Sequence, residues 1–225
     1  SALNHQVFLQ CLNGQHAINQ GIQIEALCLA SHVHVPLKQF IGCAVAVDQR
    51  TDQGEIFRHS GIITAAAQGH SDGTLSLYKL QIQDATALWH KRRNSRVFMN
   101  KTVLEVSEIL FKEWQSRSHL FAASLSLDLS GVSDRYITRP LIIQSSETDY
   151  DFLTRLWRSE GINWLIDESQ PRVADYLSPI TVQKLRLIEQ NSPFQSLKRR
   201  QIAFQRSSGV ERRDSIYAWM AQRSL

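Results

Sequence analysis

The chain has 225 residues, of which 43% are hydrophobic and 20% are charged, so it is long and apolar enough to bury one or two cores. It contains no run of roughly 18 apolar residues and no basic N-terminal segment followed by an apolar one, so the pattern predicts neither a membrane span nor a Sec signal peptide. The net charge of +4 is uneven, because residues 1–183 carry 16 Lys and Arg against 18 Asp and Glu, whereas residues 184–225 carry 9 against 3.

The first part of the chain, from Gln6 to about Gln83, has the alternation and the short apolar runs of β-strands. The runs are VFLQCL, IQIEALCLAS, CAVAVD, GIITAAA and TLSLYKLQIQ, and segments that contain glycine separate them. Several short strands at this spacing indicate an antiparallel barrel or sandwich.

A helical pattern follows in KTVLEVSEILFKEWQ, where Thr102 and Glu105 have the spacing of a capping box. Its apolar residues recur at helical spacing and predict one buried face over about three turns: Val103, Val106, Ile109, Leu110 and Trp114. AASLSLDLSG and YITRPLIIQS predict the next strands, with Pro140 at an edge or an irregular position.

The stretch from Gln144 to Ile166, QSSETDYDFLTRLWRSEGINWLI, predicts a helix with capping signals at both ends, followed by a strand. Thr148 and Asp151 repeat the capping-box spacing, and Gly161 lies where a left-handed C-cap is expected. The expected buried residues are Phe152, Leu153, Leu156 and Trp157 on the helix and Ile162, Trp164 and Ile166 on the strand. Beyond it, KLRLIEQ and RQIAFQRS predict further strands.

These segments carry a resemblance to a known family. IIQSSETDYDFLTRLWRSEGINWLI resembles a stretch of the VgrG proteins, the valine-glycine repeat spike proteins of type VI secretion, in which a strand leads into an acidic turn, a Phe-Leu-x-Arg-Leu helix and an aromatic strand. NSRVFMNKTVLEVSEIL, FRHSGIITAAAQGHSDGTLSLYKLQI and DSIYAWMAQRSL are similar to other segments of that family, in the same order. The resemblance covers the chain from about Gln6 onward.

The resemblance implies a structural protein without enzymatic activity, homologous to the baseplate hub of tailed phages. The implied fold is β-rich α+β: a first barrel-like antiparallel β domain at residues 6–88, a helical connecting segment at 89–136, and a second barrel-like domain at 137–225 that is incomplete. It implies no catalytic residue, no cofactor and no metal site.

The same resemblance implies partners and a location. The full-length protein would be a homotrimer that docks on a hexameric tube protein, carries the puncturing needle and binds effector or adaptor proteins, without nucleic acid. Assembly would take place in the bacterial cytoplasm, and export would use type VI secretion. A tailed-phage or prophage baseplate hub protein is the alternative within the family.

A serine hydrolase is the main alternative outside the family, because GHSDG, Gly69 to Gly73, matches the Gly-x-Ser-x-Gly nucleophile elbow. That elbow needs a strand before Ser71 and a helix after it. TLSLYKLQI alternates as a strand does, so we favour a hairpin turn at Asp72 and Gly73.

Other reactive residue types favour structural roles. Cys11, Cys28 and Cys43 lie among apolar neighbours without Cys-x-x-Cys spacing, so we expect buried free thiols and a reducing compartment. His32 and His34 could face one metal ion, but no third ligand is near them in the sequence.

Clustered charged residues and four tryptophans are the remaining candidates for functional residues. Glu147, Asp149 and Asp151 could be paired catalytic carboxylates, but helix capping and the helix dipole account for them. The basic stretches His90–Arg93 and Leu197–Arg206 could bind a phosphate backbone, although solvated faces or protein contacts are favoured. We expect a core or a subunit interface for four tryptophans: Trp114, Trp157, Trp164 and Trp219.

Overall fold

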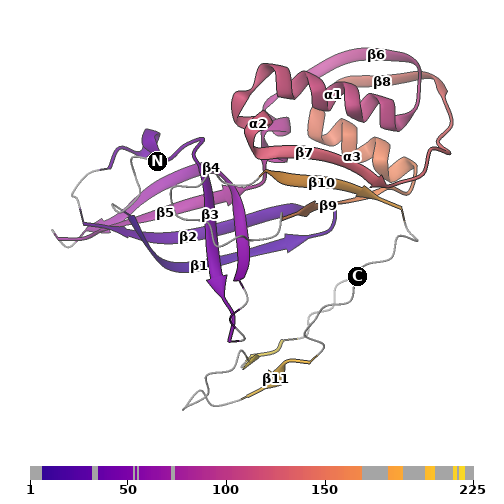
Figure 1. Ribbon diagram of the computed structural model, residues 1–225. Helices are drawn as coiled ribbons and strands as arrows, with labels where there is room; N and C mark the ends of the chain where they lie inside the picture. The colour runs from indigo at the N-terminus through magenta and orange to yellow at the C-terminus, as the bar shows by residue number, and fades with distance from the viewer. Residues whose placement is uncertain are drawn as a thin grey trace.

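The computed structural model describes residues 7–31, 35–52, 54, 56–71, 74–168, 182–189, 201–205, 215–216 and 218–220. Figure 1 shows a curled β-sheet in indigo and purple beside a lobe that contains the helices. The predicted β-rich α+β fold class is therefore confirmed.

The curled sheet contains five antiparallel strands in the order β1-β2-β5-β4-β3. Their bounds are β1 (Val7–Ala17), β2 (Gly21–Ala30), β3 (Ala44–Arg50), β4 (Ile56–Ser71) and β5 (Ser76–Gln83), with the short helix η1 (Leu37–Gln39) between β2 and β3. Gly61 lies in β4 where an added Cβ would come within 2.5 Å of the Gln83 carbonyl oxygen, and a register shift follows between Ile63 and Ala65. Close backbone approach and a bulge both bend a strand, so they contribute to the curl.

The helical lobe begins with η2 (Ala85–Lys91) and contains three helices and two small sheets. The helices are α1 (Val103–Arg117), α2 (His119–Ser124) and α3 (Asp149–Ser159). One sheet is the antiparallel ribbon of β6 (Arg93–Lys101) and β8 (Arg139–Thr148); the other has the order β7-β10-β9, from β7 (Leu125–Gly131), β10 (Gln183–Ile188) and β9 (Asn163–Asp167). β11 (Ala203–Phe204) and β12 (Ser215–Ile216) form a separate parallel pair.

The capping box predicted for α1 is confirmed. The Thr102 hydroxyl accepts from the Glu105 amide at 3.2 Å, and the Thr102 amide donates to the Glu105 carboxylate at 2.8 Å. Of the predicted face, Val103, Val106 and Leu110 are buried, Trp114 is half-buried and Ile109 is 39% exposed. Phe111 is buried in the core. The apolar stripe of α1 therefore extends to Phe111 rather than to Ile109, and the helix has 15 residues rather than the expected three turns.

The prediction for α3 is confirmed at both ends with one difference. Thr148 is the N-cap and accepts from the Asp151 amide at 3.0 Å, but the Asp151 carboxylate accepts from the Thr148 hydroxyl at 2.6 Å instead of completing a capping box. Gly161 has φ +71°, as the C-cap requires. The predicted buried residues of α3 and β9 are 0–2% exposed.

Two local features differ from the expected antiparallel strands. The segment before β7 forms α2, whose N-cap is Ser118, and β10 pairs in parallel with β7 while it pairs antiparallel with β9. The chain passes through β8, α3 and β9 between β7 and β10, and a crossover of that length permits parallel pairing. The boundaries predicted at residues 88 and 136 stay predictions.

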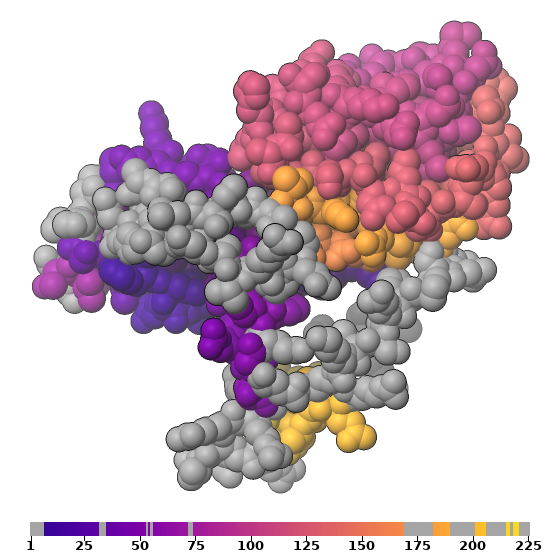
Figure 2. All heavy atoms as spheres, in the orientation of Figure 1, coloured from indigo at the N-terminus to yellow at the C-terminus, as the bar shows by residue number. Residues whose placement is uncertain are grey.

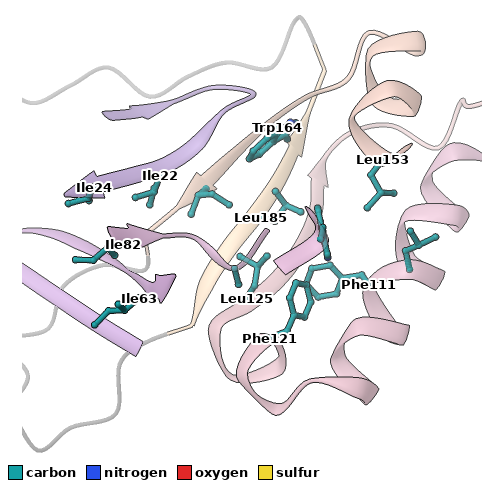
Figure 3. Close-up of a cluster of buried hydrophobic side chains, with 14 of the residues drawn as sticks. Ile22, Ile24, Ile63, Ile82, Phe111, Phe121, Leu125, Leu153, Trp164 and Leu185 are labelled. Carbon is teal, nitrogen blue, oxygen red and sulfur yellow. The ribbon is translucent and has the colours of Figure 1, made fainter. Parts of the chain in front are cut away.

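One hydrophobic cluster extends from the curled sheet into the helical lobe. Figure 3 shows Ile22, Ile24 and Ile82 of the sheet near Trp164 and Leu185, with Phe111 and Phe121 beyond them. Figure 2 shows the orange atoms of β10 along the boundary between the lobes. The two lobes therefore pack through a shared core.

Candidate assembly interface

The turn between β1 and β2 docks on the edge of β9. Asn19 has a φ of 63°. Its backbone amide donates to the Trp164 carbonyl at 2.8 Å, and the Trp164 backbone amide donates to the Asn19 side-chain oxygen at 2.9 Å. These two bonds occupy backbone groups on the outer edge of β9, as a neighbouring strand would. The turn thus fixes the curled sheet to the helical lobe.

A second polar contact joins the same two sheets. The Glu168 carboxylate accepts from the Ser60 amide at 2.8 Å and from the Ser60 hydroxyl at 2.5 Å. The Gln183 side-chain amide donates to the Ser60 carbonyl at 2.8 Å. Ser60 lies in β4 and Gln183 in β10, so this contact links strands that are 123 residues apart.

A buried ion-pair cluster supports the ribbon of β6 and β8. The Asp149 side chain is 0% exposed and accepts from Arg92 Nε at 2.6 Å, Arg96 Nη2 at 2.9 Å and Trp114 Nε1 at 2.8 Å. Glu113 of α1 accepts from both arginines, at 2.9 and 2.6 Å. The cluster therefore connects the ribbon to α1 and α3 with every buried charge paired.

The cluster also sets the protonation of Glu113. Partial burial alone would raise the pKa of this carboxyl, but the hydrogen bonds from Arg96 and Arg92 outweigh it and lower the pKa below its usual value. Glu113 is thus held ionised against the two guanidinium groups.

This arrangement corrects two sequence interpretations. Asp149 is the centre of the cluster rather than one of three acids explained by the helix dipole, and Arg92 makes internal ion pairs rather than a solvated or partner-facing basic stretch. Glu147 and Asp151 do remain at the surface end of α3, where Glu147 pairs with Arg155 at 2.5 Å. The three acids do not converge on one reaction centre.

The outer face of the ribbon is apolar and exposed. Val97 lies opposite Ile143, and Met99 lies opposite Leu141. Their exposed fractions are 55%, 48%, 67% and 52%, while the inner face places Phe98 against Phe152 at 5.9 Å between ring centroids. We call these four side chains the ribbon face. Figure 1 shows β6 and β8 at the outside of the helical lobe. A contiguous apolar patch in such a position is typical of a protein contact surface.

The hydrolase alternative lacks its required geometry. Ser71 ends β4, and the next regular element is strand β5, so Ser71 lies at a strand-to-strand connection rather than a strand-to-helix elbow. Its hydroxyl donates to the Leu75 carbonyl at 3.0 Å and accepts from Ser76 at 3.1 Å. Asp72 and Gly73, like His32 and His34, lie outside the described residues.

The cysteine prediction is correct for one residue only. Cys28 is buried, which raises the pKa of its thiol, but Cys43 is half-buried and Cys11 is exposed. A register shift between Leu9 and Cys11 moves Cys11 to the outer face, opposite Leu27. The alternation in the sequence does not reveal this bulge.

The aromatic residues divide between core and surface. Trp157 and Trp164 are buried and Trp114 is half-buried, whereas Trp219 is 74% exposed. Sequence analysis missed Trp89, which is 1% exposed and contacts Phe111, Phe121 and Trp157. The only feature of the sequence that indicated burial of Trp89 was its pairing with Leu88 before the basic stretch His90–Arg93. Of Leu197–Arg206, the structure describes residues 201–205, where Ile202 and Phe204 are about half exposed.

The described residues contain neither a metal-binding cluster nor a membrane-spanning helix. No group of three or more His, Cys, Asp or Glu side chains there could hold a metal ion. None of the helices in the same ranges has the length and apolarity that crossing a bilayer would need.

The chain is similar to known phage tail and type VI secretion proteins. Residues 15–225 match the family model of the phage tail baseplate hub (GPD). The actin cross-linking toxin VgrG1 of Vibrio cholerae is 29% identical over 160 residues, which are 67% of this chain and 14% of that protein. The type VI secretion system spike protein VgrG1b of Pseudomonas aeruginosa is 23% identical over 164 residues, 73% of this chain and 21% of that protein. The chain thus spans less than a quarter of these relatives.

Solved structures show the same fold. The E. coli c3393 protein, a type VI secretion component with structural similarity to the T4 bacteriophage tail proteins gp27 and gp5, matches with a TM-score of 0.69 at 16% identity, over 84% of this chain and 48% of that one. The Francisella PdpA–VgrG complex, half-lidded, matches with a TM-score of 0.56 at 15% identity, over 90% of this chain and 31% of that one.

Proposed function

Because the chain belongs to the phage tail baseplate hub family, we propose that it is the hub portion of a type VI secretion spike and acts by assembly rather than by catalysis. The observation that carries the proposal is the match to the hub model over residues 15–225, together with relatives that are VgrG spike proteins. A phage or prophage baseplate hub protein is the second candidate, supported by the family model itself.

The described geometry supports a mechanical role. The curled sheet and the helical lobe share one core and are joined by the Asn19 and Glu168 contacts, so a load on one lobe is carried to the other by packing and hydrogen bonds. The ribbon face offers apolar area for a neighbouring protein, and the ion-pair cluster holds it against α1 and α3.

The proposed partners are those of a spike hub. The full-length protein is a homotrimer that docks on the hexameric tube protein and carries the needle, and effector or adaptor proteins attach to it. It is assembled in the bacterial cytoplasm and exported by type VI secretion. No residue of the chain acts as a catalyst in this proposal.

Capture of the tube protein tests the proposal. The chain, tagged at its C-terminus, is mixed with hexamers of the tube protein from the same bacterium, and bound protein is measured after washing. We expect retention of the tube protein. Failure to retain it at any protein concentration that remains soluble would contradict the proposal.

A covalent serine-hydrolase probe tests the absence of catalysis separately. We expect equal background labelling of the wild type and of Ser71→Ala. Labelling that depends on Ser71 would revive the hydrolase alternative.

A further inference from the structure

The two strands of the ribbon have the sequence pattern of strands that are covered on both faces. β6 contains the apolar run VFM at residues 97–99, and β8 contains LII at residues 141–143, so neither strand alternates apolar with polar residues there. Phe98 and Ile142 point inward, where α1 contacts β6 and α3 contacts β8. An antiparallel sheet with one face in water normally has polar residues on that face. In the part of the chain that the structure describes, no second layer covers the ribbon face.

The groups behind the ribbon face hold it in one shape. Phe98 stacks on Phe152 with 5.9 Å between ring centroids. Arg96 Nε donates to the Gln144 side-chain oxygen at 2.8 Å, and the Gln144 side-chain amide donates to Asp149 at 2.9 Å. A surface that is rigid before binding loses little conformational entropy when a partner docks on it.

The dimensions of the ribbon face fit one α-helix. Neighbouring strands lie about 4.8 Å apart, and positions two apart along a strand are separated by about 6.7 Å. A helix is about 10 Å wide and repeats its side chains at i and i+4 about every 6 Å, so one helix covers both strands and both apolar pairs. An extended segment laid on the same face would leave its backbone N–H and C=O groups without partners, whereas a helix bonds them internally.

The area of the ribbon face limits the size of the contact. Four side chains that are 48–67% exposed present on the order of 400 Å². Stable complexes of two folded proteins bury roughly 800 Å² on each partner, so the ribbon face supplies about half of such an interface. One helix of a partner can be seated on an area of this size, whereas a dimer that used only this face would be weak.

One end of the ribbon face carries a cation without an acidic partner. Arg93 Nε and Nη2 donate to the Ser146 carbonyl at 3.1 and 2.7 Å, beside the Ser95 and Ser146 hydroxyls, which lie 3.2 Å apart. Among the described residues, no carboxylate lies within ion-pair distance of Arg93, and its Nη1 makes no hydrogen bond. A carboxylate from outside could therefore bind this guanidinium without displacing an internal acid.

The opposite end carries cations that already have acids. Lys101 pairs with Glu105 at 2.9 Å, and Arg139 pairs with Glu160. Two ribbon faces packed against each other with their strands aligned would bring Arg93 near Arg93 or Lys101 of the other copy, and neither contact supplies a carboxylate. Like charges across an interface repel, so the charges disfavour a second copy and favour a partner with an acid at the Arg93 end.

We propose that the ribbon face docks one amphipathic helix of another protein, with the apolar residues of that helix on the two strand pairs and an Asp or Glu side chain on Arg93. The inference rests on the proposed assembly function, and it adds the kind of partner segment that this face takes.

Fluorescence anisotropy on the 225-residue chain tests the docking. The probe is a labelled, stapled helical peptide of about four turns, with Leu at i, i+3, i+4 and i+7 and Glu in the last turn. Met99→Gln should weaken binding by about tenfold, because it removes apolar area from the ribbon face. Phe57→Gln is the matched control, since Phe57 is 56% exposed on β4 of the curled sheet and its loss should leave binding unchanged.

An exchange of charges tests the contact with Arg93. Arg93→Glu should weaken binding of the Glu peptide by about tenfold, because a carboxylate then faces a carboxylate. A peptide with Lys in place of Glu should regain most of that loss on Arg93→Glu, which a merely structural role of Arg93 would not produce. Equal losses for the two peptides would overturn the assigned contact.

Circular dichroism establishes that each variant is folded, and Leu141→Gln, on the same face, replaces Met99→Gln if that variant unfolds. No binding at any soluble peptide concentration, or equal weakening by Met99→Gln and Phe57→Gln, would overturn the inference. A dimer of the chain in light scattering that Met99→Gln dissociates would assign the face to a second copy and would overturn it too. Tube capture is measured separately on the wild type, so failure of the hub proposal and failure of this inference give different results.

Discussion

At the scale of single residues, Gly21 is fixed by two constraints. Its φ is +72°, and a Cβ built on it would lie 2.2 Å from the Asp84 carboxylate, which accepts from the Ile22 amide at 2.8 Å. Asp84 is buried, and its burial raises the pKa of the carboxyl. Any side chain at Gly21 must therefore displace a buried polar group.

Gly161 provides the control for this position, because its φ is +71° and nothing lies within 4 Å of an added Cβ. We expect Gly161→Ala to cost about 1 kcal/mol from backbone strain alone. Gly21→Ala should cost about 2 kcal/mol more, because the overlap with Asp84 adds to the same strain. Urea unfolding measures the free energy of unfolding of the two variants. Equal losses of stability would show that the contact with Asp84 is unimportant.

Asp149 gives a second residue-scale prediction. Asp149→Asn removes the charge that faces Arg92 and Arg96 and leaves two half-buried guanidinium groups with one carboxylate, so we expect a loss of about 3–5 kcal/mol. Asp151→Asn, two residues along the same helix at an exposed position, should cost about 1 kcal/mol or less. Thermal unfolding of the pair measures the difference, and similar losses would mean that the cluster contributes little.

At the scale of elements, the contact between α1 and the ribbon should depend on pH. The folded-state pKa of Glu113 is lowered from 4.5, so its contribution to stability is present above about pH 4.5 and is lost as the pH falls through the lowered value. We expect the melting temperature of wild type to fall more steeply below pH 4.5 than that of Glu113→Gln. Asp48 and Asp128 also have lowered pKa values, so part of the fall in melting temperature below pH 4.5 should remain in Glu113→Gln. Identical slopes for the two proteins would exclude this role of Glu113.

The elements that sequence predicts well are those whose signals are local. Thr102 and Glu105 are three residues apart, and Gly161 directly follows the last turn of α3, so propensity and capping rules define both helices. The same holds for the alternation of Ile162, Trp164 and Ile166.

Features that depend on distant residues could not be predicted in this way. Asp149 and Arg92 are 57 positions apart in the sequence. The helix dipole alone was enough to explain an acidic residue at position 149, so nothing in the sequence pointed to its pairing with Arg92. The parallel pairing of β7 with β10 joins residues on either side of β8, α3 and β9, and the bulge that exposes Cys11 is set by the register with β2. Trp89 lies in a short 3-10 helix, where helical and strand periodicities do not apply.

At the scale of the whole molecule, the structure combines one continuous core with an exposed apolar surface. The inside is one continuous apolar core, the buried carboxylate of Asp149 is paired with Arg92 and Arg96, and the outside presents the ribbon face. Among the described groups that looked reactive in the sequence, Ser71 hydrogen-bonds within the β4–β5 connection, Asp151 bonds the N-cap of α3, and Glu147 and Asp149 form ion pairs. An exposed apolar surface of this kind suits the assembly role that we propose.

Electron microscopy of tube ends tests whether the chain binds the tip of the tube. Tubes assembled from the tube protein of the same bacterium are incubated with the chain carrying a gold-labelled C-terminal tag, and the positions of gold along each tube are recorded. We expect gold at one end of the tubes and none along their length. Gold distributed along the walls, or tubes that remain unlabelled while the chain stays folded, would contradict a hub role.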